Sequence, residues 1–184
     1  KNQERDYAIL TLFLNCGLRI SELVGLNLQD IQDETMRILG KGNKERIVYL
    51  NEQCVDAVTK YTEARKSVAD PKEKALFISK RGNRITNRRV EQIIDDRLKA
   101  CGLAGKGISV HKLRHTAATL MYQNGVDVRV LKEVLGHENL NTTQIYTHVV
   151  NTQLRDAINS NPVMDIKNDL PEPDLKQNED KNSK

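Results

Sequence analysis

Apolar residues recur every three or four positions through most of this sequence, and that spacing constrains its fold more than any other feature. It predicts helices over residues 5–16, 20–25, 51–67, 87–101, 110–124, 127–135 and 152–159, and a further one that carries Tyr146. Asn87 and Asp127 are expected to cap helices, and Gly17 and Gly136 to end them. The helix over 5–16 has almost no polar face, so we expect it to be central.

A single region breaks this spacing. Met36 and Ile38 alternate with polar neighbours, as do Ile47 and Tyr49, on either side of a glycine-containing turn at 40–44. This pattern predicts a β-hairpin, and residues 76–78 are expected to add a short strand. The predicted fold class is therefore mainly α with a small antiparallel β-hairpin sheet (α+β).

The length of 184 residues fits one domain with a real core, which we expect to span residues 1–161. Residues 162–184 have low hydrophobicity and many charges, so we expect them to form a disordered acidic and polar tail.

The compartment is expected to be the cytoplasm. No apolar run approaches the length of a membrane span, and the first residues do not resemble a signal peptide, so no membrane partner is expected. Cys16, Cys54 and Cys101 are odd in number and lie in apolar patterns, which indicates reduced core thiols.

The net charge of +4 is unevenly distributed. Residues 162–184 contain six acidic residues and four lysines, a net −2, which leaves +6 for residues 1–161. Basic residues cluster at Lys41, Lys44 and Arg46, and again at Arg81, Arg84, Arg88 and Arg89. Such clusters suit contacts to DNA phosphates, although a solvated basic face fits the charge alone equally well.

Several familiar catalytic signatures are absent from the sequence. It has no glycine-rich phosphate loop, no Cys-x-x-Cys pair and no Gly-x-Ser-x-Gly turn. His111 and His115 have a metal-ligand spacing, but the intervening Lys112 and Arg114 disfavour a bound cation. We therefore expect neither a metal nor another cofactor.

A set of polar residues has a joint chemical interpretation, although each could singly be an ordinary surface or core residue. The set is Arg19, Lys41, His111, Arg114, His137 and Tyr146. Two arginines can hold the non-bridging oxygens of a phosphodiester, and two histidines can donate hydrogen bonds or move protons. A lysine at a hairpin tip can protonate a departing sugar oxygen, while a tyrosine oxygen attacks phosphorus.

Four sequence boxes resemble motifs of the tyrosine recombinase (phage integrase) family, and their residues are most similar to those of its Xer branch. They are Gly17-Leu18-Arg19-Ile20-Ser21-Glu22-Leu23, Gly40-Lys41-Gly42-Asn43-Lys44-Glu45-Arg46, His111-Lys112-Leu113-Arg114-His115, and Leu135-Gly136-His137 with Thr142-Thr143-Gln144-Ile145-Tyr146-Thr147-His148. They occur in the family's order, and the resemblance covers about residues 5–158.

The resemblance implies a role for each residue of the set. Arg19 and Arg114 would hold the scissile phosphate, with His111 and His137 as the box histidines. Lys41 would be the general acid, and Tyr146 would form a 3′-phosphotyrosyl link. His115 and His148 also match residues of the family's motifs and are expected to be structural.

The resemblance also implies partners. The substrate would be double-stranded DNA, contacted by Lys44, Arg46, Arg81, Arg84, Arg88, Arg89 and Gln92. Other protomers would join a homomeric or heteromeric tetramer, with the last helix docking on a neighbour. From the resemblance we expect the family's N-terminal DNA-binding domain to be absent from this chain, and the acidic tail is longer than expected for the Xer branch.

Three alternatives remain open at this point. A type IB topoisomerase-like or hairpin-forming enzyme would use the same chemistry. A non-catalytic DNA-binding module would use only the basic hairpin and the helix over 87–101. A metallohydrolase would need the His111–His115 pair to hold a metal.

Overall fold

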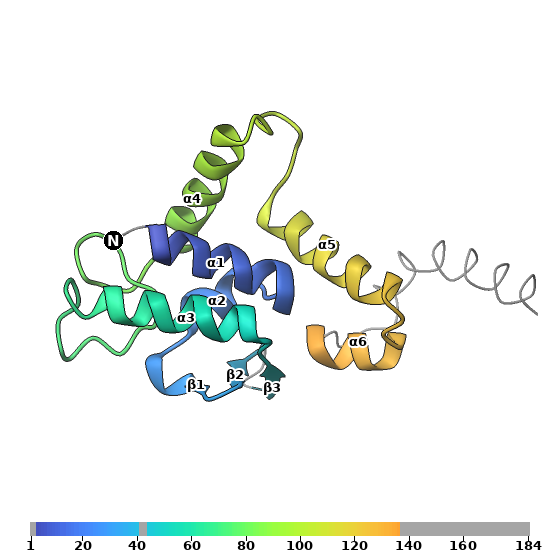
Figure 1. Ribbon diagram of the computed structural model, residues 1–184, viewed down its shortest axis with the longest axis horizontal. Helices are drawn as coiled ribbons and strands as arrows, with labels where there is room; N and C mark the ends of the chain where they lie inside the picture. The colour runs from blue at the N-terminus through green and yellow to red at the C-terminus, as the bar shows by residue number, and fades with distance from the viewer. Residues whose placement is uncertain (1–2, 41–43, 137–184) are drawn as a thin grey trace, which may run out of the picture. The chain divides into compact units, whose positions relative to one another are not determined.

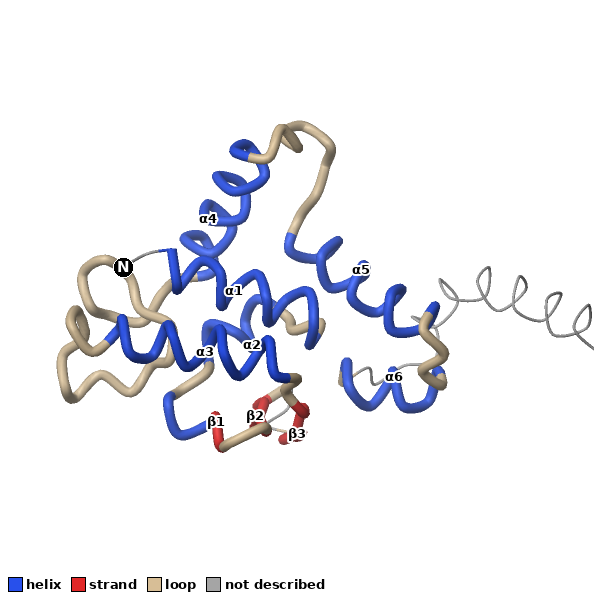
Figure 2. Tube along the Cα trace, in the orientation of Figure 1, coloured by secondary structure: helices blue, strands red, loops and turns tan. Residues whose placement is uncertain are grey.

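A computed structural model describes residues 3–40 and 44–136 of the chain. Predictions about Lys41, His137, Tyr146, His148, the last helix and the tail lie outside the described residues. The described elements, in chain order, are α1 (Gln3–Cys16), α2 (Ile20–Gly25), the short 3₁₀ helix η1 (Leu28–Asp30), β1 (Ile31–Gln32), β2 (Thr35–Leu39), β3 (Glu45–Tyr49), α3 (Glu52–Arg65), α4 (Asn87–Ala100), α5 (Val110–Gln123) and α6 (Val128–Leu135). Figures 1 and 2 show the predicted fold class, helices with one small sheet.

Helix α1 is central, as its nearly all-round apolar pattern predicts. It packs against α3, α4 and α5 (Figure 1). Ile9, Leu12 and Phe13 are fully buried within the main apolar core. The buried carboxylate of Asp6 binds Arg5 at 2.9 Å and Arg97 at 2.6 Å, which joins α1 to α4. The core therefore forms around α1, and Leu23 of α2 belongs to the same core.

The predicted hairpin is present, with a third strand that the sequence pattern did not reveal. The strands are antiparallel in the order β1-β2-β3, and Ile38 pairs with Arg46. Met36, Ile38 and Val48 are buried, whereas Ile47 and Tyr49 are exposed. Because side chains alternate along a strand, burial of Val48 puts Arg46 on the inner face beside Ile38. The inward orientation of Arg46 follows from this register.

Several local predictions are wrong in detail. The cap of α4 is Thr86, whose side chain accepts from the Arg89 amide, and Asn87 is the first helical residue. Residues 76–78 form no strand, because pairing around them is limited to the isolated bridges Asn27–Ala75 and Ile78–Arg84. Cys101 is exposed because it follows the last residue of α4. Cys16 and Cys54 are buried as expected.

The predicted helix ends around α6 are confirmed. The side chain of Asp127 accepts from the Arg129 amide at the start of the helix. Gly136 follows its last residue with φ +64°, the left-handed conformation that ends many helices. The C-terminal end of α6 is therefore set locally, immediately before His137.

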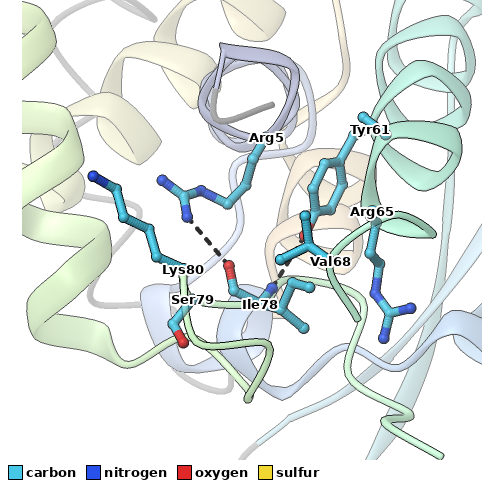
Figure 3. A pocket seen from close by; sticks show the side chains of 8 residues that line it. Arg5, Tyr61, Arg65, Val68, Ile78, Ser79 and Lys80 are labelled. Carbon is cyan, nitrogen blue, oxygen red and sulfur yellow. Dashed lines mark hydrogen bonds between the residues drawn. The ribbon is translucent and has the colours of Figure 1, made fainter. Parts of the chain in front are cut away.

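A shallow hollow lies beside the junction of α1, α3 and residues 78–80 (Figure 3). Its wall includes Tyr61, whose hydroxyl accepts from the Ile78 amide at 3.1 Å. Arg5 donates to the Ile78 carbonyl at 3.2 Å, and Arg65 donates to the Ala75 carbonyl at 2.8 Å. These two side chains hold the backbone of residues 75–80 in place. The polar groups around the hollow therefore have a structural role.

Candidate active site

Arg19 lies at the start of α2, after the turn at Gly17. Its Nη1 donates to Glu22 Oε1 at 2.8 Å, and its Nη2 donates to the Gly136 carbonyl at 2.9 Å. The side chain remains 40% exposed. Arg19 is therefore fixed by partners on α2 and just beyond α6, yet part of it faces solvent, where a phosphate could reach it.

Arg114 lies on α5 and is buried. Its Nη2 donates to the Leu135 carbonyl at 2.7 Å, and its Nη1 donates to the Gly17 carbonyl. Arg19 Nη1 reaches the same Leu135 carbonyl at 3.4 Å. The two guanidinium groups thus converge on one carbonyl oxygen, although their residues are 95 positions apart in the sequence.

Glu22 is a site residue that the sequence interpretation missed. Its side chain is 3% exposed and accepts from both Arg19 and Arg46, and one oxygen lies 4.0 Å from Arg114 Nη1. The Arg-x-x-Glu spacing was visible in the sequence, but such pairs are usually surface ion pairs. Here the carboxylate supplies negative charge beside three guanidinium groups.

The environment of Glu22 keeps it ionised. Burial by itself raises the pKa of the Glu22 carboxyl. The hydrogen bonds from Arg46 and from the Arg19 amide, with the positive charge of Arg46, outweigh burial and hold the pKa below its ordinary value. A Glu22 that is charged at neutral pH can therefore compensate the repulsion among the arginines.

Arg46 has internal hydrogen-bond partners, and its predicted DNA contact stays a prediction. Its Nη1 and Nη2 donate to the two oxygens of Glu22 at 2.8 and 2.9 Å, and its Nε donates to the Val134 carbonyl at 3.0 Å. The side chain is 15% exposed. Because all three nitrogens have internal acceptors, Arg46 belongs to the framework of the site.

The C-terminal end of α6 receives hydrogen bonds from all three arginines. Arg46 binds the Val134 carbonyl, Arg19 and Arg114 bind the Leu135 carbonyl, and Arg19 binds the Gly136 carbonyl. The last carbonyls of a helix lack partners within the helix and carry its partial negative charge. The helix end is thus a second counter-charge for the arginines, beside Glu22.

His111 and His115 are exposed on the first two turns of α5. His111 lies one turn before the buried Arg114, a spacing that puts the two residues near one helix face. Within residues 3–40 and 44–136, no group of three or more potential metal ligands is present. Lys41, His137 and Tyr146 lie outside the described residues, but Gly40 and Gly136, directly before the first two, are described.

The predicted DNA-contacting residues around α4 divide into two kinds. Arg84 donates to the carbonyls of Val24 and Leu26 at 2.7 and 3.0 Å and to the Asn27 side chain, so it has a structural role, and its predicted DNA contact stays a prediction. Arg81, Arg88 and Gln92 are exposed, as is Lys44. Arg89 is partly buried and donates to Gln92 Oε1 at 3.2 Å.

Comparison with known proteins bears on this arrangement. Residues 1–153 match the sequence pattern of the phage integrase family. The chain is 55% identical over 162 residues to tyrosine recombinase XerC of Caldanaerobacter subterraneus subsp. tengcongensis, an alignment that covers 88% of this chain and 46% of that protein. A similar alignment to XerC of Corynebacterium glutamicum has 46% identity and covers 84% of this chain and 50% of that protein.

Solved structures have the same fold. The crystal structure of XerA recombinase matches with a TM-score of 0.74 and 35% identity, over 86% of this chain and 58% of that one. The XerH recombinase, bound to its palindromic difH substrate in a post-cleavage complex, matches with a TM-score of 0.72 and 28% identity, over 86% and 46% of the two chains.

The chain spans about half the length of the curated relatives it matches.

In the part of the chain that the structure describes, no helix is long and apolar enough to cross a membrane. The extent of the family match and the identity to XerC agree with the converging arginines on α2 and α5. The chain therefore belongs to the phage integrase family of tyrosine recombinases and is similar to its Xer members.

Proposed function

We propose that the protein is a site-specific DNA recombinase that breaks and rejoins DNA strands through a covalent link to Tyr146. The observation that carries this proposal is the convergence of Arg19 and Arg114 on the Leu135 carbonyl, at 3.4 and 2.7 Å. Two guanidinium groups that converge on one oxygen atom suit the two non-bridging oxygens of one phosphodiester. Their charge would stabilise the negative charge that develops as phosphorus is attacked.

The proposed cleavage step exchanges one phosphate ester for another. The phenol oxygen of Tyr146 bonds to phosphorus and loses its proton, while the bond from phosphorus to the 5′ oxygen breaks. Lys41 donates a proton to that oxygen, and the DNA strand leaves with a free 5′-hydroxyl. His111 and His137 would donate hydrogen bonds to the phosphate and accept the phenol proton.

Rejoining reverses these steps. A 5′-hydroxyl attacks the phosphotyrosyl bond and releases Tyr146. Because the phosphotyrosyl bond retains the energy of the bond that was broken, the proposed cycle needs no nucleotide and no metal.

We propose that DNA lies along the basic residues around α4. Exposed Arg81, Arg88 and Gln92, with partly buried Arg89, would contact bases or phosphates, and Lys44 would contact a phosphate near the hairpin. The XerH structure, which contains its difH substrate, supports double-stranded DNA as the ligand. Long polar side chains such as Arg and Gln suit hydrogen bonds to base edges in the major groove.

The active assembly is proposed to be a tetramer on two DNA duplexes, in the cytoplasm, with identical or related protomers. The segment 152–159 is proposed to dock on a neighbouring protomer. Size measurement by light scattering on DNA carrying a recombination site would test this part. A complex of four protomers on two duplexes is expected, and a monomer that cleaves and rejoins by itself would favour the topoisomerase-like alternative.

The test of the chemistry is covalent trapping on a nicked DNA substrate. We expect the protein to form an adduct resistant to denaturation, Tyr146→Phe to form none while still binding DNA, and Arg114→Ala to form far less. Tyr49→Phe is the matched control, because Tyr49 is 80% exposed on the outer face of the sheet. An adduct that persists in Tyr146→Phe would reject Tyr146 as the nucleophile, and no adduct in any variant would favour the DNA-binding module.

A further inference from the structure

The guanidinium group of Arg46 lies between two glycines from distant parts of the chain. A Cβ atom added to Gly136 would lie 2.9 Å from Arg46 Nη1 and 3.1 Å from Cζ, and one added to Gly40 would lie 3.8 Å from Nη1. The residue after Gly40 is Lys41, and the residue after Gly136 is His137. One side chain thus lies beside both of the glycines that directly precede two proposed catalytic residues.

Three elements hold this side chain in a single orientation. The fork of Nη1 and Nη2 meets both oxygens of Glu22 on α2, and Nε meets the Val134 carbonyl on α6. Arg46 itself belongs to β3. A guanidinium group is planar and offers donors along several edges, so it can bind a carboxylate and a carbonyl at once. A lysine has one nitrogen and cannot span the same acceptors with this geometry.

These contacts connect the hairpin with the end of α6. Gly40 and Arg46 lie on opposite sides of the hairpin turn, and the Gly40 amide donates to the Lys44 carbonyl at 2.8 Å. Gly136 follows α6 and has no side chain, so its backbone can approach the guanidinium closely. A shift of Arg46 would therefore displace both backbone segments relative to Arg19 and Glu22.

We propose that Arg46 is a positioning residue for the cleavage step. It fastens the hairpin to the C-terminal end of α6 and so aligns Lys41 and His137 with the arginines that hold the phosphate. This inference rests on the proposed function, in which Lys41 is the general acid. Because Arg46 faces the protein interior, it should affect the rate of cleavage and leave the affinity for DNA unchanged.

The experiment measures covalent adduct formation in a single turnover, at saturating protein, with two nicked DNA substrates. One substrate has the normal 5′ oxygen as the leaving atom, and the other has sulfur in its place. A thiolate is a much weaker base than an alkoxide and can leave without a proton, so the sulfur substrate bypasses the general acid. Arg46→Gln, Arg46→Lys, Lys41→Ala and Arg19→Ala are compared in the full chain, with DNA affinity measured separately.

On the oxygen substrate we expect Arg46→Gln to be slower by on the order of 100-fold, the usual effect of misplacing a catalytic group by about 1 Å. On the sulfur substrate most of this loss should disappear, as it should for Lys41→Ala. Arg19→Ala should remain slow on both substrates, because phosphate binding is needed in either case. Arg46→Lys should recover part of the rate on the oxygen substrate.

The matched control is Arg37→Gln on the neighbouring strand β2. Arg37 is exposed and pairs with Asp30 and Glu45, outside the site, so its loss should change neither rate. Far-UV circular dichroism and urea unfolding establish that each variant is folded. If Arg46→Gln does not fold, Arg46→Lys, which keeps the charge, is tested by the same comparison.

Two results would overturn the inference and are distinguishable from each other. Arg46 does not position the acid if its variants are equally slow on both substrates. The same holds if the variants lose DNA affinity while their cleavage rate is unchanged. In either case the proposed function stands. If Lys41→Ala is not rescued by sulfur, Lys41 is not the acid, and that part of the proposed function fails together with the inference.

Discussion

Glu22 and Arg46 form a two-pronged ion pair in which each oxygen of the carboxylate accepts from a different guanidinium nitrogen, at 2.8 and 2.9 Å. The pair joins α2 to β3, and the same carboxylate also accepts from Arg19. Glu22 is 24 positions from Arg46 and three from Arg19, so one carboxylate holds two sequence boxes together.

Glu22→Gln should destabilise the protein. The substitution keeps the shape of the side chain but removes the negative charge that the buried guanidinium groups share. Breaking a buried ion pair from one side typically costs about 3–5 kcal/mol in the free energy of unfolding. Urea unfolding followed by circular dichroism measures the change. Glu45→Gln is the control, because Glu45 is 55% exposed in its pair with Arg37 and should change stability by less than about 1 kcal/mol. Equal stability of Glu22→Gln and the parent would contradict the assigned role.

The contribution of Glu22 to stability should depend on pH. Its pKa in the folded protein lies below the ordinary value of 4.5, so the folded state favours the charged carboxylate. The contribution is therefore complete above about pH 4.5 and is lost as the pH falls through the folded-state pKa. We expect the difference in unfolding free energy between the parent protein and Glu22→Gln to shrink between pH 6 and pH 3. Urea titrations of both proteins across this pH range measure that difference. A difference that grows on acidification would show that the pKa of Glu22 is raised, not lowered, by folding.

Gly17→Ala should disturb the carbonyl on which Arg19 and Arg114 converge. Gly17 has φ +60°, and an added Cβ would lie 2.7 Å from Leu135 Cδ2. The backbone conformation alone costs an L-residue about 1–2 kcal/mol, and the close contact must also move Leu135. We expect a lower melting temperature and slower adduct formation. Gly25→Ala is the control, since an added Cβ there meets nothing within 4 Å. Unchanged stability of Gly17→Ala would argue against this packing.

Substitution of Arg88 should weaken DNA binding, whereas substitution of Arg84 should lower the stability of the fold. Arg88 is exposed on α4, so Arg88→Gln should weaken DNA binding without changing stability. One lost phosphate contact should reduce the slope of log affinity against log salt concentration by about 0.9. Arg84→Gln should leave that slope unchanged and lower the free energy of unfolding by about 1–3 kcal/mol, because it leaves the Val24 and Leu26 carbonyls without this donor. Salt titrations of DNA binding, paired with urea unfolding, separate the two. A change of slope in Arg84→Gln would show that Arg84 also contacts DNA.

Much of the fold was predictable because its signals are local. Helix α6 begins at a capping aspartate and ends at a left-handed glycine, and both are properties of a few adjacent residues. The apolar pattern of α1 indicated a central helix, and the hairpin followed from alternation around its turn. The four sequence boxes also identified the family, since each is a short run of neighbouring residues. The N-cap of α4 was wrong by one residue, because Thr86 and Asn87 are both good capping residues and the sequence does not rank them.

The sequence by itself determined the helices, the hairpin and the set of arginines available to the site. Only the tertiary structure decided what each arginine binds. Arg46 and Arg84 carry the same positive charge as exposed Arg88, yet packing brings backbone carbonyls and carboxylate or amide oxygens within reach of their guanidinium groups. A hydrogen bond needs its acceptor within about 3 Å, and that proximity depends on how distant segments pack, which a linear pattern of residue types does not specify.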